Sequence, residues 1–199
     1  QMEDEIKKHD ENFKNTGLFV NHTLLNRDAN RLYFFAREGW YKGGNKTNVA
    51  FSIHLDGSNL KRHEQHIGGH PEWAEGNVMI GRNGKRQILY DVDEKKEVGQ
   101  LGNPEIFPNP EGDISLSPNG DWFVNGYKVE SEDGNKNFYS VYRRSDGAFV
   151  RSIGINKGSF NGDIRIDPAP RWNRTNDKIL VPGLDKNNTR QMFVISVLH

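Results

Sequence analysis

Three side chains at equivalent positions of an internal repeat could together hold a divalent metal. His22, His70 and Asp113 each stand where one repeat opens. Two imidazoles and a carboxylate form a donor set suited to Mn, Fe, Ni or Zn, and a carboxylate also suits Ca. Near pH 7 the imidazole is largely neutral and the carboxylate is ionised, so both can bind. Each residue could instead cap its strand or hydrogen-bond a neighbouring loop, and both interpretations stay open.

Basic and aromatic residues elsewhere could bind a carboxylate or stack on a sugar ring. Arg165, Asp167 and Arg171 surround the opening of the last repeat. Arg171 could bind a carboxylate through two parallel hydrogen bonds, or it could pair with Asp167 and join two repeats. Trp40 and Tyr41 belong to a long loop, where their flat faces could stack on a sugar ring or pack against the protein itself.

The composition excludes several other classes of function. The chain has 199 residues, with 27 basic and 27 acidic side chains. A net charge of zero argues against a general attraction to nucleic acid or to an anionic membrane. Without cysteine there is no thiol nucleophile, disulfide or cysteine zinc site. No apolar run approaches the roughly 20 residues that span a bilayer. The sequence also lacks a glycine-rich phosphate loop and a nucleophile elbow, and we expect no organic cofactor.

A repeat of short strands must position the candidate residues. Each of four segments has an opening strand, a tight polar turn, an apolar second strand and a third strand rich in aromatic and β-branched residues. The turns Asp56-Gly57-Ser58 and Asp146-Gly147 predict hairpins into a fourth strand. We expect opening strands at 21–25, 69–73, 112–116 and 168–172, second strands at 31–36, 77–81, 121–125 and 178–182, third strands at 48–55, 86–92, 137–142 and 190–197, and fourth strands near 60–63, 97–101 and 148–153.

The spacing of the repeats predicts an all-β propeller. Equivalent positions 22, 70, 113 and 169 are 48, 43 and 56 residues apart, and four-stranded units of roughly 40–50 residues are typical of propeller blades. Trp73 and Trp172 occupy the same position in their repeats, and we expect both in the core between blades. A β-sandwich with similarly spaced strands is the alternative. We expect about four blades, at about 18–65, 66–105, 106–158 and 159–199.

The two ends of the chain make the predicted propeller incomplete. Residues 1–17 form a polar lead, expected to be a short helix over Glu3 to Phe13 or disordered, and they lack the alternating pattern of a strand. The last repeat has three strands, so its edge would be open. We therefore expect the blades to belong to a larger propeller of six to eight blades, or to associate with a second copy.

Several strings resemble the blade openings of TolB-like propellers, and more narrowly those of the oligogalacturonate lyase type. They are His70-Pro71-Glu72-Trp73, the segment Asp113 to Gly120 and the segment Arg165 to Arg174. Arg190 to Ser196 is similar to a third-strand string of that family, and Asn21-His22 to another of its blade openings. The resemblance runs from about Val20 to the C-terminus.

The resemblance implies a metal-assisted polysaccharide lyase that acts by β-elimination on an acidic, uronate-containing oligosaccharide. It implies a divalent metal held by histidines at the blade openings, of which this sequence keeps His22 and His70 and has Asp113 at the third position, together with basic groups that neutralise the uronate carboxylate. We assign catalytic roles to Arg165 and Arg171, and substrate binding to Trp40, Tyr41 and Arg171.

Ala169 stands where the family has a histidine. This departure favours a second hypothesis, a non-catalytic TolB-like propeller that serves as a binding or assembly scaffold. The sequence leaves the compartment open, and we favour a bacterial periplasmic or secreted location slightly over the cytoplasm.

Overall fold

The computed structural model describes residues 1–11, 13–41, 43–44, 46–110, 113–132 and 134–197. The chain divides into two compact units, which are described separately. Unit 1 comprises Gln1–His66, Trp73–Val78 and Asp91–Lys96, and unit 2 comprises Ile67–Glu72, Met79–Tyr90 and Glu97–His199. Among the residues described, no helix is long and apolar enough to cross a membrane.

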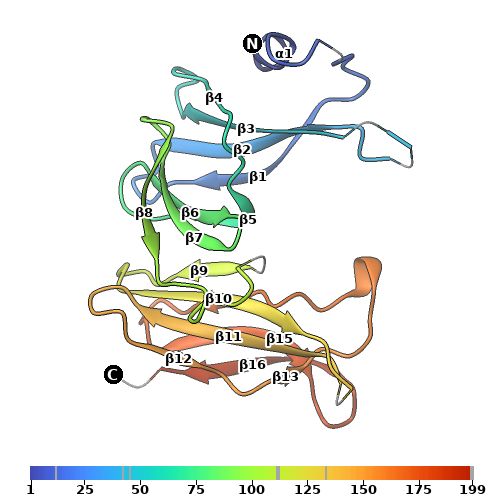
Figure 1. The fold of residues 1–199 in the computed structure, drawn as a ribbon, viewed down its shortest axis with the longest axis vertical. Coiled ribbons are helices and arrows are strands. Elements are labelled where there is room, and N and C mark those ends of the chain that lie inside the picture. The colour runs from blue at the N-terminus through green and yellow to red at the C-terminus, as the bar shows by residue number, and fades with distance from the viewer. Residues whose placement is uncertain (12, 42, 45, 111–112, 133, 198–199) are drawn as a thin grey trace. The chain divides into compact units, whose positions relative to one another are not determined.

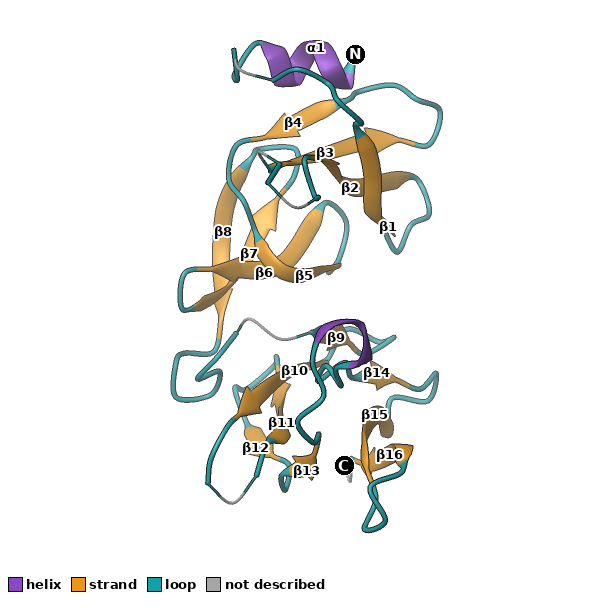
Figure 2. Cartoon of the chain, turned by 90° about the vertical axis from the view of Figure 1, so that its right-hand side faces the viewer, coloured by secondary structure: helices purple, strands orange, loops and turns teal. Residues whose placement is uncertain are grey.

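Four antiparallel sheets follow one another along the chain (Figures 1 and 2). Within each sheet the strands lie side by side in chain order, as in the blades of a propeller. We number these sheets blades 1 to 4. Blade 1 contains β1 (Phe19–Leu25), β2 (Arg31–Glu38), β3 (Thr47–His54) and β4 (Lys61–His63), and blade 2 contains β5 (Gly68–Trp73), β6 (Val78–Asn83), β7 (Arg86–Asp91) and β8 (Lys96–Leu101). Blade 1 lies in unit 1, whereas the residues of blade 2 are divided between the units.

The other two blades belong to unit 2 and differ in their number of strands. Blade 3 contains β9 (Ile114–Leu116), β10 (Trp122–Val129), β11 (Lys136–Arg143), β12 (Phe149–Arg151) and the short β13 (Ile155–Asn156), which also pairs with β11. Blade 4 has the order β14 (Arg171–Trp172), β15 (Lys178–Leu184) and β16 (Arg190–Ser196). The all-β prediction, with about four antiparallel blades, is confirmed.

Turn chemistry explains why the strands are short. Gly57 and Gly147 have φ values of +83° and +77°, which glycine adopts at little cost, and they lie in two of the predicted hairpins. Asp56 strengthens the first of these turns because its Oδ1 accepts a hydrogen bond from the amide of Ser58 at 2.8 Å.

Each unit has its own hydrophobic core. In unit 1, Ile6 of helix α1 (Met2–Lys7) is buried together with Phe13, Phe34, Ala36 and Phe51, so the polar lead is anchored to the blade through its few apolar residues. In unit 2, residues of blades 3 and 4 share one cluster, whose buried members are Val124, Tyr139, Val141, Ile179 and Val181. Packing between successive sheets therefore supplies the core that one thin sheet lacks.

Some boundaries differ from those expected. The last opening strand begins at Arg171 rather than at 168, because Pro168 and Pro170 have no N–H group for a ladder. Helix α1 ends at Lys7, well short of Phe13. Strand β13 was not expected, and β10 continues to Val129, beyond the predicted end at residue 125. Gly112, in the predicted third opening strand, lies outside the described residues.

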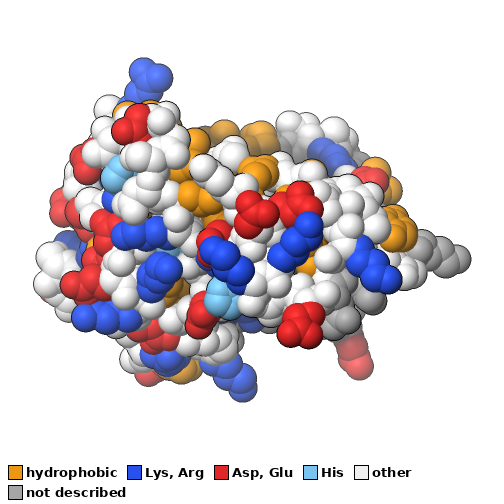
Figure 3. Space-filling view, turned by 90° about the horizontal axis from the view of Figure 1, so that it is seen from above, with side chains coloured by type: hydrophobic (Ala, Val, Ile, Leu, Met, Phe, Trp, Pro, Cys, Tyr) orange, Lys and Arg blue, Asp and Glu red, His pale blue; other side chains and the backbone are white. Residues whose placement is uncertain are grey.

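Charges of both signs are mixed on the surface. Figure 3 shows one face, on which acidic and basic side chains are interspersed rather than gathered in one patch. This pattern agrees with the zero net charge.

Candidate functional site

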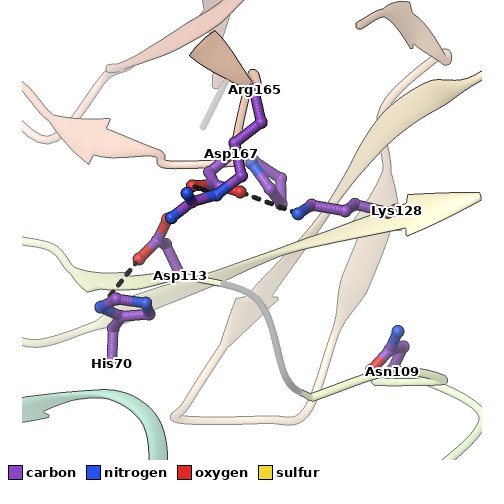
Figure 4. A pocket seen from close by; sticks show the side chains of 7 residues that line it. His70, Asn109, Asp113, Lys128, Arg165 and Asp167 are labelled. Atoms are coloured by element: carbon purple, nitrogen blue, oxygen red, sulfur yellow. Dashed lines mark hydrogen bonds and ion pairs between the residues drawn. The ribbon is translucent and has the colours of Figure 1, made fainter. Parts of the chain in front are cut away.

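Two of the predicted metal ligands meet in unit 2. His70 lies in β5 and Asp113 directly precedes β9, and an isolated parallel bridge joins the two residues. Nδ1 of His70 lies 3.4 Å from Oδ1 of Asp113 (Figure 4). The His70 side chain is 52% exposed and that of Asp113 only 12%. The opening of blade 3 thus supplies a mostly buried carboxylate to an accessible imidazole on the opening of blade 2.

Asp167 joins two cations nearby. Nζ of Lys128, in β10, lies 2.7 Å from its Oδ1, and Nε of Arg165 lies 2.7 Å from its Oδ2. Burial alone would raise the pKa of Asp167, but the hydrogen bond from Lys128 and the two positive charges outweigh burial and hold this pKa below its ordinary value. The group therefore consists of one ionised carboxylate and two cations, with one positive charge in surplus.

The two groups line one cavity of about 290 Å³. Figure 4 shows Lys128 on one side of this cavity and His70 on the other, with Asp167, Arg165 and Asp113 between them. Asn109 and Pro168 complete the lining. The charged lining therefore consists of two cations and two carboxylates, beside the imidazole of His70.

His22, the third predicted metal ligand, belongs to unit 1. It lies in the irregular part of β1, where the register with β2 shifts, and its φ is +51°. Its ring packs edge-on against Phe35 at 6.0 Å, and Nη1 of Arg37 lies 3.4 Å from its Nδ1. Because the two units are described separately, the centre formed by His22, His70 and Asp113 stays a prediction.

The donors present in unit 2 fit a metal only in part. Two donors on one ion at tetrahedral angles are ~3.4 Å apart for metal–ligand distances near 2.1 Å, which matches the separation of His70 Nδ1 and Asp113 Oδ1. Within the described ranges, however, no group of three or more His, Asp or Glu side chains is arranged to hold an ion. A complete site would need a further donor.

Arg171 has a different setting from the one expected. Its Nη1 donates to the carbonyl oxygens of Ile114 at 3.1 Å and Pro170 at 2.8 Å. Asp167, which the sequence offered as an alternative partner of Arg171, pairs with Lys128 and Arg165. The contact with Ile114 connects blade 4 to the opening strand of blade 3.

Trp40 and Tyr41 lie in unit 1, on the loop between β2 and β3. Trp40 is 47% exposed and has two cations over its ring, Arg37 at 4.6 Å and Lys46 at 4.8 Å. Tyr41 is 63% exposed and lines a separate cavity of about 490 Å³. Their role in substrate binding stays a prediction.

Sequence reasoning missed Lys128 and Asn109. Lys128 reaches the site because β10 extends four residues beyond Asn125, and its partner Asp167 is 39 residues further along the chain. A continued strand pattern through Tyr127 and Val129 was the available signal. Asn109 lies in a loop whose sequence gives no signal of its position.

Comparison with solved structures supports a TolB-like β-propeller fold. TolB from Acinetobacter baumannii is 14% identical, with a TM-score of 0.59, and the match covers 88% of this chain and 40% of that one. The β-propeller domain of the Trilobed protease from Pyrococcus furiosus, described as having an open velcro topology, is 12% identical, with a TM-score of 0.50 and coverage of 89% and 55%. Acylaminoacyl peptidase from Pyrococcus horikoshii is 11% identical, with a TM-score of 0.57 and coverage of 96% and 33%.

These similarities establish the fold and favour the propeller over the sandwich. The chain spans between about a third and just over half of the length of these structures. No protein-family model matches the sequence, and no curated protein is significantly similar to it.

Proposed function

We propose that the chain is a propeller segment that binds an acidic oligosaccharide in the cavity of unit 2. The observation that carries this proposal is the polarity of that cavity. Lys128 and Arg165 share the carboxylate of Asp167 towards one end, and His70, with its partner Asp113, lies towards the other. A sugar acid has a carboxylate for the first end and hydroxyl groups for the second.

The cationic end suits a carboxylate ligand. Lys128 and Arg165 are 40% and 54% exposed, so a ligand can reach them. Arg165 uses Nε for Asp167 and Nη1 for the carbonyl oxygen of Gly162 at 3.0 Å. These contacts orient the guanidinium, and an arginine has five N–H donors in all. A bound carboxylate would give these two cations an acceptor beside Asp167.

The other end suits hydroxyl groups and proton transfer. Asp113 can accept the Nδ1–H of His70, which leaves Nε2 as the basic nitrogen of the ring. In β-elimination from a uronate, His70 Nε2 would take the C5 proton and the C5–H electrons would form the C4–C5 double bond. The C4–O bond would break, and the leaving oxygen would take a proton from water. Lys128 and Arg165 would stabilise the negative charge that develops on the carboxylate.

A divalent metal held by His70 and Asp113 would supply charge neutralisation at the uronate carboxylate, but a metal-bound His70 could not also take the C5 proton. The proposed binding mode does not require it.

Calorimetric titration with trigalacturonate tests the binding step. We expect binding that weakens about tenfold or more in Lys128→Ala, because truncating one member of a charged contact costs about 2–5 kcal/mol. Lys96→Ala is the matched control, since Lys96 is an exposed lysine that pairs with Glu94 and does not line this cavity. Absence of binding, or equal loss in both variants, would overturn the proposal.

The lyase step is tested separately by the ultraviolet absorbance of the unsaturated product. We expect product with the unmodified chain and none with His70→Ala. Binding without any product would overturn the lyase step and favour a binding propeller without catalysis.

A further inference from the structure

A second cavity in unit 2, of about 590 Å³, adjoins the proposed sugar-acid site. It shares Arg165 and Asp167 with the first cavity, and Pro182, Arg190 and Met192 line its other side. These last three residues come from the hairpin of β15 and β16, where Pro182 pairs with Met192 in the register. The volume is within the range of small-ligand sites, roughly 300–1,000 Å³.

The ionisable lining of this second cavity is cationic. Its charged lining residues are two arginines, Arg165 and Arg190, and one carboxylate, Asp167. Asp167 is also neutralised by Lys128, which does not line this cavity. The surplus of positive charge favours an anionic ligand, and paired arginines favour a planar carboxylate.

Arg190 is held in position before any ligand arrives. Its guanidinium lies over the ring of Phe160 at 4.8 Å, and Nη2 donates to the carbonyl oxygen of Ile164. A group fixed by such contacts loses little conformational entropy on binding. Arg165 is likewise held by Asp167 and Gly162.

The rest of the wall is largely apolar. Ile166, Ala169, Pro182 and Met192 line it, and the Met192 side chain is 55% exposed. An exposed methionine beside two arginines is suited to a ligand with an apolar group next to its carboxylate. A sugar acid lacks such a group, so this cavity differs in chemistry from the first.

The position on blade 4 points to a peptide rather than to a small amphiphile. In the part of the chain that the structure describes, β16 has β15 as its one neighbour in the sheet order. An edge strand offers backbone N–H and C=O groups to an added strand. Arg190 and Met192 are among the first residues of β16, so the cavity and the strand edge lie together.

We propose that this cavity binds the C-terminal carboxylate of a peptide whose last side chain is apolar. Arg165 and Arg190 bind the carboxylate, Met192 and Pro182 contact the last side chain, and the edge of β16 pairs with the residues before it. The site is independent of the sugar-acid proposal except that both use Arg165.

Fluorescence polarisation with a labelled Ala-Ala-Leu peptide that has a free carboxylate tests the site on the full chain. We expect saturable binding, and binding about tenfold weaker for the same peptide with a C-terminal amide, because the charge that the arginines recognise is absent. Unlabelled octanoate should compete much more weakly than the unlabelled peptide. Equal binding of acid and amide, or octanoate competing as well as the peptide, would overturn the proposal.

Two substitutions locate the binding. Arg190→Gln should weaken the acid peptide about tenfold and leave the amide nearly unchanged. Arg151→Gln is the matched control, since Arg151 also lies over a phenylalanine ring, at 5.8 Å from Phe149, and lines neither cavity. Met192→Ser should reduce the preference for Leu over Ser at the last position. Equal effects of the two arginine variants would place the binding elsewhere.

The two proposals fail in different ways. His70 lines the first cavity and not the second. His70→Ala should therefore keep peptide binding while abolishing the elimination product. Loss of peptide binding in His70→Ala would contradict a separate peptide site, whereas failure of trigalacturonate to bind would leave the peptide result unaffected.

Discussion

The indole Nε1 of Trp73, at the end of β5, donates a hydrogen bond to the carbonyl oxygen of Leu24 in β1 at 2.8 Å. Trp172, which has the equivalent position in blade 4, makes the same kind of contact with the carbonyl oxygen of Ser115 in β9 at 3.2 Å. Each tryptophan therefore ties its blade to the opening strand of the blade before it. Trp73 is 3% exposed and Trp172 packs on the core of blades 3 and 4, which confirms the predicted position of both.

Replacing either tryptophan by phenylalanine should destabilise the chain by about 1–2 kcal/mol, because the carbonyl oxygen loses its partner while most of the apolar contact remains. Urea unfolding followed by circular dichroism measures the loss. Trp40→Phe is the control, since the Trp40 side chain is 47% exposed and donates to the carbonyl oxygen of Thr47, at the start of β3 in its own blade. Losses no larger than that of the control would show that the two contacts between blades contribute little.

Gly126→Ala adds a single methyl group, but it should lower the free energy of unfolding markedly. A β-carbon at Gly126 would lie 2.0 Å from the carbonyl oxygen of Pro168, and backbone must move to accept it. We expect a loss of about 2 kcal/mol or more in the free energy of unfolding. Gly99→Ala is the comparison, because its β-carbon would meet only the flexible end of Leu89 at 3.2 Å. Similar thermal midpoints for the two variants would contradict the close approach of β10 to the segment before β14.

Stability should fall as the pH drops from about 6.5 to 4 because of His63. Burial, followed by the nearby positive charges of Lys95, Lys61 and Arg31, lowers the pKa of His63 from 6.5 to about 4. In this range the unfolded chain binds the proton and the folded chain does not, so acid favours unfolding, by an amount on the order of 3 kcal/mol at pH 4.

Urea titrations at pH 7 and pH 4.5 measure this effect against His63→Gln. Glutamine can keep a hydrogen bond to Ser52, whose Oγ lies 2.9 Å from Nε2 of His63, but it does not titrate. The difference in stability between the two proteins should therefore shrink at the lower pH. A constant difference would rule out a buried neutral imidazole.

The predicted metal centre can be tested by its stoichiometry. We expect chain stripped with chelator and dialysed against Zn²⁺ or Mn²⁺ to retain one ion, with metal–ligand distances of roughly 2.0–2.3 Å by X-ray absorption. His22→Ala and His70→Ala should each weaken retention by at least about tenfold, because each removes one of few ligands. Retention that is unchanged in His22→Ala would remove this residue from the site.

Among the described residues β16 is the outermost strand of blade 4, and this position predicts association. Strand β16 presents Met192 and Val194, which are 55% and 56% exposed, and an exposed apolar strand edge favours pairing. We expect light scattering to report a mass above that of one chain. A monomer of 22.8 kDa that persists on dilution and unfolds cooperatively would contradict this expectation.

The repeat could be predicted from the sequence because its signals are local. Alternating apolar residues and turns such as Asp56-Gly57-Ser58 act over a few neighbours, and they located the strands of the four blades to within a few residues. The pairing of Lys128 with Asp167 depends on how two blades pack, and no local pattern encodes it. The same holds for Arg171, whose sequence neighbours include Asp167 but whose contact is with Ile114.

The contacts of Trp73 and Trp172 also bear on how blades can be added to such a chain during evolution. The residue that joins a blade to its predecessor is carried by the later blade, in its own opening strand. Its acceptor is a main-chain carbonyl oxygen, which every sequence provides. A gene duplication that copied one such repeat would also copy its tryptophan. The new blade could therefore hydrogen-bond to the preceding blade without any change in the sequence of that blade. Blades could then be added one at a time, each already held to its predecessor by this contact, while the side chains that line the cavities diverged.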